Sequence, residues 1–132
     1  MFKTVLFPID RSRETQEAAE VVVEIVQKYG SRLILLSVVE ASEEASEGMK
    51  SPDVVARLLE DAQSVFKQQG IQTEAIERQG KPAFVICDVA DEVSANLIVM
   101  GCRGLGLTEE GVTESVTNRV INLSPCPVLV VP

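Results

Sequence analysis

A glycine-rich segment in the C-terminal third of the chain carries residues whose types and spacing suit an anion. Residues 101–115, GCRGLGLTEEGVTES, hold four glycines between an apolar run and a helical pattern. Glycine lets a backbone approach a ligand closely. Ser115 falls in the first turn of the next helix, where free N–H groups and the helix dipole favour an anion. No Walker or Rossmann pattern is matched, so spacing alone also fits a surface loop before an ordinary capped helix.

The same segment carries three carboxylates, which oppose a bound phosphate chain. They are Glu109, Glu110 and Glu114. One carboxylate ~5 Å from one phosphate charge costs about 1 kcal/mol in water, and about 3 kcal/mol at an effective dielectric constant of about 20. A helix dipole returns only about 0.3–2 kcal/mol. The segment is therefore predicted to tolerate a nucleotide but to disfavour a triphosphate, unless Mg²⁺ intervenes or Glu114 points away.

A second polar group lies where the first apolar run ends. The run TVLFPID (residues 4–10) is typical of a strand buried on both faces, and it ends at Asp10. An aspartate there commonly caps the following loop or helix. Alternatively, Asp10 accepts hydrogen bonds from a hydroxyl or amine of a ligand. The second interpretation gains weight because the glycine-rich segment is expected at the same edge of the sheet.

Composition excludes several classes of function. The net charge of −8 argues against nucleic acid and against anionic membranes as partners. The chain has no histidine, and its three cysteines, Cys87, Cys102 and Cys126, form no CxxC motif, so a histidine base, a histidine-ligated metal site, a zinc ribbon and a redox motif are not expected. Without a base beside a nucleophile, turnover is predicted to be slow or absent. No signal peptide or apolar run of about 18 residues is seen, which predicts a cytoplasmic protein.

The elements that must position these residues alternate along the chain. Strands are predicted at residues 4–10, 32–40, 71–77, 96–101 and 126–132, the third of them near a sheet edge. Amphipathic helices lie between them, ended by Gly30 and Gly70 or begun at Ser51 and Pro82, with Val65 and Ile121 among the inward residues. The acidic residues 40–50 show no periodicity and are predicted to be a loop. The pattern predicts one α/β domain over residues 1–132, a parallel sheet with helices on both faces. Ligands of such sheets bind beyond the carboxyl ends of the strands.

The whole chain resembles the universal stress protein family. That family shows a G-x2-G-x9-G-[ST] motif after strand four, and here Gly101 and Gly104 are followed, nine residues on, by Glu114 and Ser115. The opening VLFPID, the GKPA before the third long helix and the final SPCPVLVVP also match. The resemblance implies an adenine-nucleotide alpha-hydrolase-like fold of strand order 3-2-1-4-5, with the ligand between strands one and four. Glu114 stands where the family has its third glycine.

The resemblance also implies a set of binding residues and partners. An adenine nucleotide, ATP or AMP, with Mg²⁺ accompanying ATP, is expected to meet the residues Pro8, Asp10, Val38, Met100, Gly101, Arg103, Gly104, Glu114, Ser115 and Val116. A homodimer through the last strand is implied as well. The first interpretation is a nucleotide-binding sensor or regulatory module. The alternative is a member that binds no nucleotide and acts only through protein–protein contacts.

Overall fold

The computed structural model describes residues 1–40, 47–101 and 116–132. Within these ranges strands and helices alternate, with one short additional helix. The strands are β1 (Thr4–Pro8), β2 (Arg32–Glu40), β3 (Thr73–Gly80), β4 (Leu97–Gly101) and β5 (Val128–Val131). The helices are α1 (Arg13–Tyr29), α2 (Glu47–Lys50), α3 (Pro52–Gln68), α4 (Pro82–Glu92) and α5 (Val116–Leu123).

The strands form one parallel sheet, which confirms the predicted fold class. Its order is β3-β2-β1-β4-β5, and each neighbouring pair runs parallel. The central strand β1 lies between β2 and β4, and β3 and β5 form the edges. Strand order reverses beside β1, because the chain proceeds outward through β2 to β3 and then returns to β4. At such a point the loops after the two central strands diverge and leave room for a ligand.

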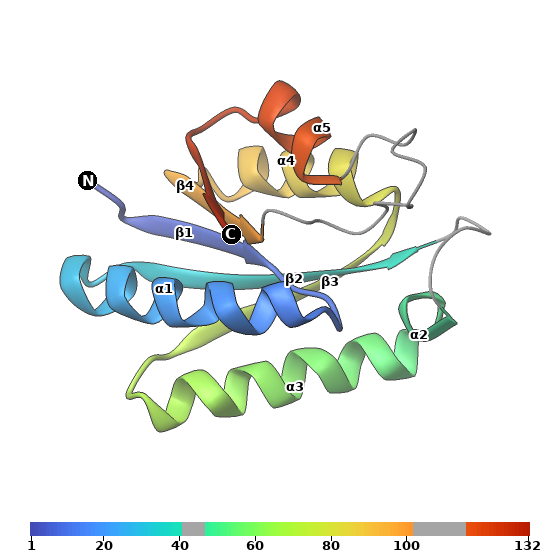
Figure 1. The fold of residues 1–132 in the computed structure, drawn as a ribbon, viewed down its shortest axis with the longest axis horizontal. Coiled ribbons are helices and arrows are strands. Elements are labelled where there is room, and N and C mark those ends of the chain that lie inside the picture. The colour runs from blue at the N-terminus through green and yellow to red at the C-terminus, as the bar shows by residue number, and fades with distance from the viewer. Residues whose placement is uncertain (41–46, 102–115) are drawn as a thin grey trace.

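Helices cover both faces of the sheet, as expected for buried parallel strands. Figure 1 shows α1 and α3 on one face and α4 and α5 on the other. Alternate strand residues feed two separate cores, so that Phe7 and Leu35 pack with α1 and α3, while Leu6 and Leu36 pack with α4 and α5. Burying each such side chain contributes about 1.5–3 kcal/mol. The two cores hold the carboxyl ends of the central strands in fixed positions.

The helix boundaries follow from capping residues in the sequence. Ser12 caps α1 by accepting a hydrogen bond from the Thr15 N–H, and Gly30 ends that helix in the left-handed conformation at φ 62°. Ser51 caps α3 in the same way, with Pro52 as its first residue. The predicted ends at Gly30 and Ser51 are therefore confirmed.

Two residues predicted to face inward are exposed instead. The Val65 side chain on α3 is 53% exposed, and Ile121 on α5 is 49% exposed. Each is adjacent in sequence to a buried residue, Phe66 or Val120. Successive helical residues point about 100° apart, so these two lie at the margin of the buried stripe. The apolar pattern of the sequence therefore predicted a buried stripe that is one residue too wide on α3 and on α5.

The prediction of a loop over residues 40–50 is wrong at its C-terminal end, where α2 occupies Glu47–Lys50. Glu40 is the last residue of β2, as the strand predicted at residues 32–40 requires. Residues 41–46 lie outside the described ranges. Met49 is 3% exposed and joins the core beneath α1 and α3. One buried methionine thus fixes a short helix in a segment too acidic and too irregular to show a helical period.

Candidate functional site

A cleft lies at the carboxyl ends of β1 and β4, where the strand order reverses. Residues after β1, the ends of β2 and β4, and α1, α2, α4 and α5 all contribute to it. Its lining residues are Pro8, Ile9, Asp10, Ser12, Glu14, Thr15, Leu36, Val38, Glu40, Met49, Pro82, Ile86, Met100, Gly101, Val116 and Thr117. The cleft therefore occupies the place where ligands bind in open parallel sheets.

Most of the predicted binding residues come together in this cleft. Those that line it are Pro8, Asp10, Val38, Met100, Gly101 and Val116. The others, Arg103, Gly104, Glu114 and Ser115, belong to residues 102–115, which lie outside the described ranges. The structure thus brings the predicted nucleoside side of the site into one place. The predicted phosphate side stays a prediction from the sequence.

Asp10 organises the turn between β1 and α1. The strand itself ends at Pro8, two residues earlier than predicted, although the Ile9 N–H still donates to the Leu36 carbonyl at 2.8 Å. Asp10 Oδ1 accepts from the Ser12 N–H at 2.7 Å and from the Thr15 hydroxyl at 2.8 Å. The two donors lie in the turn and in the first turn of α1, and both engage the same oxygen. The structural interpretation of Asp10 is therefore correct, and it does not exclude a ligand at the other oxygen.

Gly101 has a packing reason to be glycine that the sequence did not reveal. A Cβ placed there would lie 2.6 Å from Glu14 Cβ and 3.4 Å from the Glu14 carbonyl group. Real Cβ atoms do not approach so closely, so the first turn of α1 can touch the end of β4 only because a side chain is absent. The sequence had suggested that this glycine admits a ligand. Its closest neighbour is instead the protein's own helix.

Thr117 ties α5 to the end of β4. Its hydroxyl donates to the Gly101 carbonyl at 2.9 Å, and the residue is 2% exposed. This bond joins the first turn of α5 to Gly101, the last described residue before the 102–115 segment. Sequence reasoning missed it, although a threonine three residues before the buried Val120 lies on the same helix face. Thr117 thereby holds the start of α5 against the end of β4.

Glu40 is a second carboxyl group of the cleft, and it was not among the binding residues that the resemblance implied. It is half-buried at the end of β2 and lines the cleft. Burial, with a contribution from the charge of Asp10, raises the pKa of the Glu40 carboxyl above its usual value. Leu36, Val38 and Glu40 alternate with the core residues of the opposite face, so they share one face of β2. Glu40 is thus the first polar side chain on the wall that begins with Leu36 and Val38.

The described part of the cleft is acidic. Asp10, Glu14 and Glu40 line it, and no lysine or arginine is among its described lining residues. Each carboxylate disfavours further negative charge nearby. The structure therefore adds charges from three separate elements to those that the sequence already places in residues 102–115.

The cleft is also narrow. Its volume is about 50 Å³, well below the roughly 300–1,000 Å³ of sites that enclose a small molecule. Its lining includes Met49 and Met100, whose unbranched side chains adapt to different contents. A ligand of nucleoside size would lie partly in the open mouth or displace these methionines.

Two further findings bear on chemistry. Among the described residues, no group of three or more aspartate, glutamate or cysteine side chains is placed to hold a metal ion. Burial raises the pKa of the Cys87 and Cys126 thiols, which disfavours the nucleophilic thiolate form.

None of the helices in the described ranges is long and apolar enough to cross a bilayer.

A doubly wound parallel sheet with a cleft at its reversal point defines the class of open-sheet α/β proteins. Comparison with known proteins narrows this class, since the sequence profile of the universal stress protein family matches residues 1–132. Universal stress protein Sll1654 of Synechocystis sp. is 66% identical over all of this chain and 87% of its own length. The chain belongs to the universal stress protein family.

Solved structures show the same architecture. Hypothetical protein MJ0577 superimposes with a TM-score of 0.85 at 28% identity, covering 99% of this chain and 96% of the other. A universal stress protein crystallised in complex with cAMP gives a TM-score of 0.80 at 25% identity, covering 99% and 97%. The strand order implied by the resemblance is thus the order found in the structure.

Proposed function

We propose that this chain binds an adenine nucleotide with a short phosphate chain, and acts as a sensor or regulatory module rather than as an enzyme. One observation carries the proposal: Pro8, Asp10, Val38, Met100 and Gly101 line one cleft at the reversal point of the sheet. A similar protein, crystallised in complex with cAMP, adds support, because that ligand is an adenine nucleotide with a single phosphate.

The charges of the cleft support a monophosphate or a nucleoside over a triphosphate. Asp10, Glu14 and Glu40 come from separate elements of the described chain, and the sequence adds Glu109 and Glu110. Each pair of a carboxylate charge and a phosphate charge ~5 Å apart weakens the binding free energy by about 1–3 kcal/mol. Several phosphate charges multiply that cost, whereas adenosine avoids it. Bound Mg²⁺ would offset part of the cost for ATP.

Calorimetric titration with adenosine, AMP and ATP, each with and without Mg²⁺, tests the proposal. AMP and adenosine should bind at least as tightly as metal-free ATP. Tighter binding of metal-free ATP would contradict the charge argument. Absence of binding by every adenine compound would favour the alternative, a member that acts only through protein–protein contacts, which the small volume of the cleft supports.

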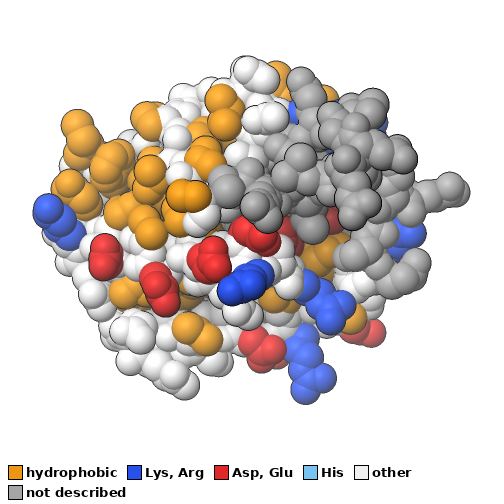
Figure 2. All heavy atoms as spheres, viewed as in Figure 1, with side chains coloured by type: hydrophobic (Ala, Val, Ile, Leu, Met, Phe, Trp, Pro, Cys, Tyr) orange, Lys and Arg blue, Asp and Glu red, His pale blue; other side chains and the backbone are white. Residues whose placement is uncertain are grey.

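We also propose a homodimer through β5. The strand Val128–Val131 pairs with β4 on one side and carries only apolar side chains, with Leu129 37% exposed. Figure 2 shows hydrophobic side chains gathered in the region that lies between the two chain termini marked in Figure 1. An apolar edge strand left open invites association, and pairing with a twofold copy closes it.

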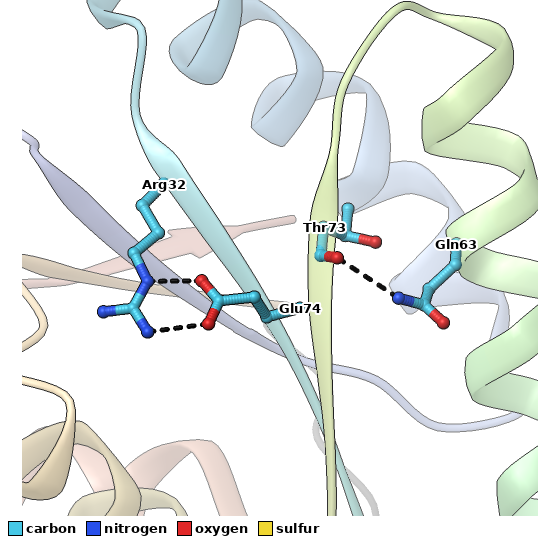
Figure 3. Close-up of polar contacts among 4 residues, drawn as sticks. All are labelled: Arg32, Gln63, Thr73 and Glu74. Atoms are coloured by element: carbon cyan, nitrogen blue, oxygen red, sulfur yellow. Dashed lines mark hydrogen bonds and ion pairs between the residues drawn. The ribbon is translucent and has the colours of Figure 1, made fainter.

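The opposite edge of the sheet is protected in a way that β5 is not. Figure 3 shows Arg32 on β2 paired with Glu74 on β3, and Gln63 on α3 donating to the Thr73 carbonyl. Charged and covered edges resist strand pairing. A dimer should therefore form at β5 and not at β3. Sedimentation of Leu129→Asp should give a monomer where the unmodified chain gives a dimer, and a monomer for both would overturn the proposal.

A further inference from the structure

Strand β2 extends the cleft wall beyond the point where β1 ends. Pro8, the last residue of β1, pairs with Leu36, while β2 runs four residues further and pairs with β3 as far as Gly80. Residues on one face of a strand are about 7 Å apart along it. The side chain of Glu40 therefore follows that of Val38 on the same wall, one step outward toward the mouth.

The chemistry at this step differs from that of the rest of the wall. Leu36 and Val38 belong to the buried core over α4 and α5, and they contribute only apolar side chains to the cleft wall. Glu40 is half-buried and lies close enough to Asp10 for the two charges to interact. An ionised carboxylate only accepts hydrogen bonds. A ligand group that donates one would relieve both the burial and the repulsion, whereas a carbonyl oxygen would add to them.

We propose that Glu40 is a specificity-determining residue of the nucleotide site, whose carboxylate accepts a hydrogen bond from the exocyclic amine of the base. The proposal rests on the proposed function, which places the base against Val38. On this proposal, the Glu40 side chain determines that the site prefers an amino purine to an oxo purine. A site that hydrogen-bonds a substrate group rejects the analogue lacking that group more strongly than an apolar pocket does.

The test compares adenosine with inosine, which carries an oxo group in place of the amine and has no phosphate. Calorimetric titrations at about pH 8, where an exposed or moderately shifted carboxyl is ionised, are made on the unmodified chain, on Glu40→Gln and on Glu77→Gln. Glu77 is an exposed residue of β3 outside the cleft lining, so its variant matches the change in charge and shape. Circular dichroism checks that each variant is folded.

The unmodified chain and Glu77→Gln should prefer adenosine by roughly tenfold or more, as expected for a hydrogen bond to a charged group. Glu40→Gln should reduce this preference to near unity, because its amide both donates and accepts. Equal reduction by Glu77→Gln, or an unchanged preference in Glu40→Gln, would overturn the role of Glu40 while leaving nucleotide binding intact. If the unmodified chain bound neither nucleoside nor AMP, both this inference and the proposed function would fail.

Discussion

Replacing Gly101 by alanine should destabilise the protein in the absence of any ligand. The added Cβ would lie 2.6 Å from Glu14 Cβ and 3.4 Å from the Glu14 backbone. None of these atoms can rotate away, so α1 or the end of β4 must move. Overpacking of this kind costs about 1–3 kcal/mol. For a chain of this size, that loss corresponds to a fall in Tm of roughly 3–10 °C.

A second glycine provides the matched control. In Gly48→Ala the new Cβ would overlap the guanidinium end of Arg11. That group lies at the far end of a flexible side chain and can turn aside, while alanine is favoured over glycine in a helix by about 1 kcal/mol. Gly48→Ala should therefore leave the unfolding free energy unchanged or raise it. The added Cβ lies nearer to its neighbour in Gly48→Ala than in Gly101→Ala. The expected loss of stability is nevertheless smaller in Gly48→Ala, because backbone and Cβ atoms are fixed and a long side chain is not.

Urea unfolding followed by far-UV circular dichroism measures both variants, since the chain has no tryptophan. The cost of Gly101→Ala should also persist in a Glu14→Ala background, because alanine retains the Cβ that causes the clash. If Gly101→Ala were as stable as the unmodified protein but failed to bind AMP, the packing explanation would be refuted. Gly101 would then be glycine for the sake of the ligand.

Three further changes test other contacts. Thr117→Val removes the hydroxyl that donates to the Gly101 carbonyl at 2.9 Å and should cost about 1–3 kcal/mol in urea unfolding, whereas Thr73→Val, on the edge strand, should stay within about 0.5 kcal/mol; equal costs would show that the bond is not stabilising. Because burial and Asp10 raise the folded-state pKa of Glu40, its ionisation opposes folding as the pH rises through that pKa. Glu40→Gln should therefore increase stability near pH 8, with the gain shrinking toward about pH 4; a gain independent of pH would contradict this sign. Glu114→Gly should raise ATP affinity more than adenosine affinity, and the difference should fall with added salt if the carboxylate is exposed; an unchanged ratio in parallel titrations would make Glu114 a helix-start residue only.

The sequence predicted the sheet and its helices because local rules and long-range packing agree there. Buried strands read as apolar runs, and Ser51 followed by Pro52 marks a helix start wherever it occurs. The family resemblance supplied the strand order, which local patterns do not contain. Where a single side chain decides, the prediction was wrong: Met49 stabilises a helix within an acidic segment, and Val65 lies just outside the stripe that its neighbours occupy.

The cleft could be predicted only in part. Asp10 and Met100 stand at strand ends, where the fold class places a ligand, so sequence patterns could find them. No sequence pattern distinguishes Glu14, and Glu40 is distinguished only as the last residue of the strand predicted at residues 32–40. Glu14 enters the cleft because the first turn of α1 packs against Gly101, which has no side chain. Glu40 enters it because β2 extends four residues beyond Leu36, the partner of the last residue of β1. Both causes are contacts between segments far apart in the chain, which no local pattern records.

AMP binding to the unmodified protein and to Asp10→Asn, measured side by side by calorimetry, tests the central claim most directly. Asparagine keeps the Oδ1 acceptor that holds the Ser12 N–H and the Thr15 hydroxyl, but replaces the second carboxylate oxygen by a donor. The unmodified protein should bind AMP, and Asp10→Asn should bind it roughly tenfold or more weakly with little change in Tm. Equal affinity for AMP in the two proteins, or no binding by either, would contradict the assignment of this cleft as a nucleotide site.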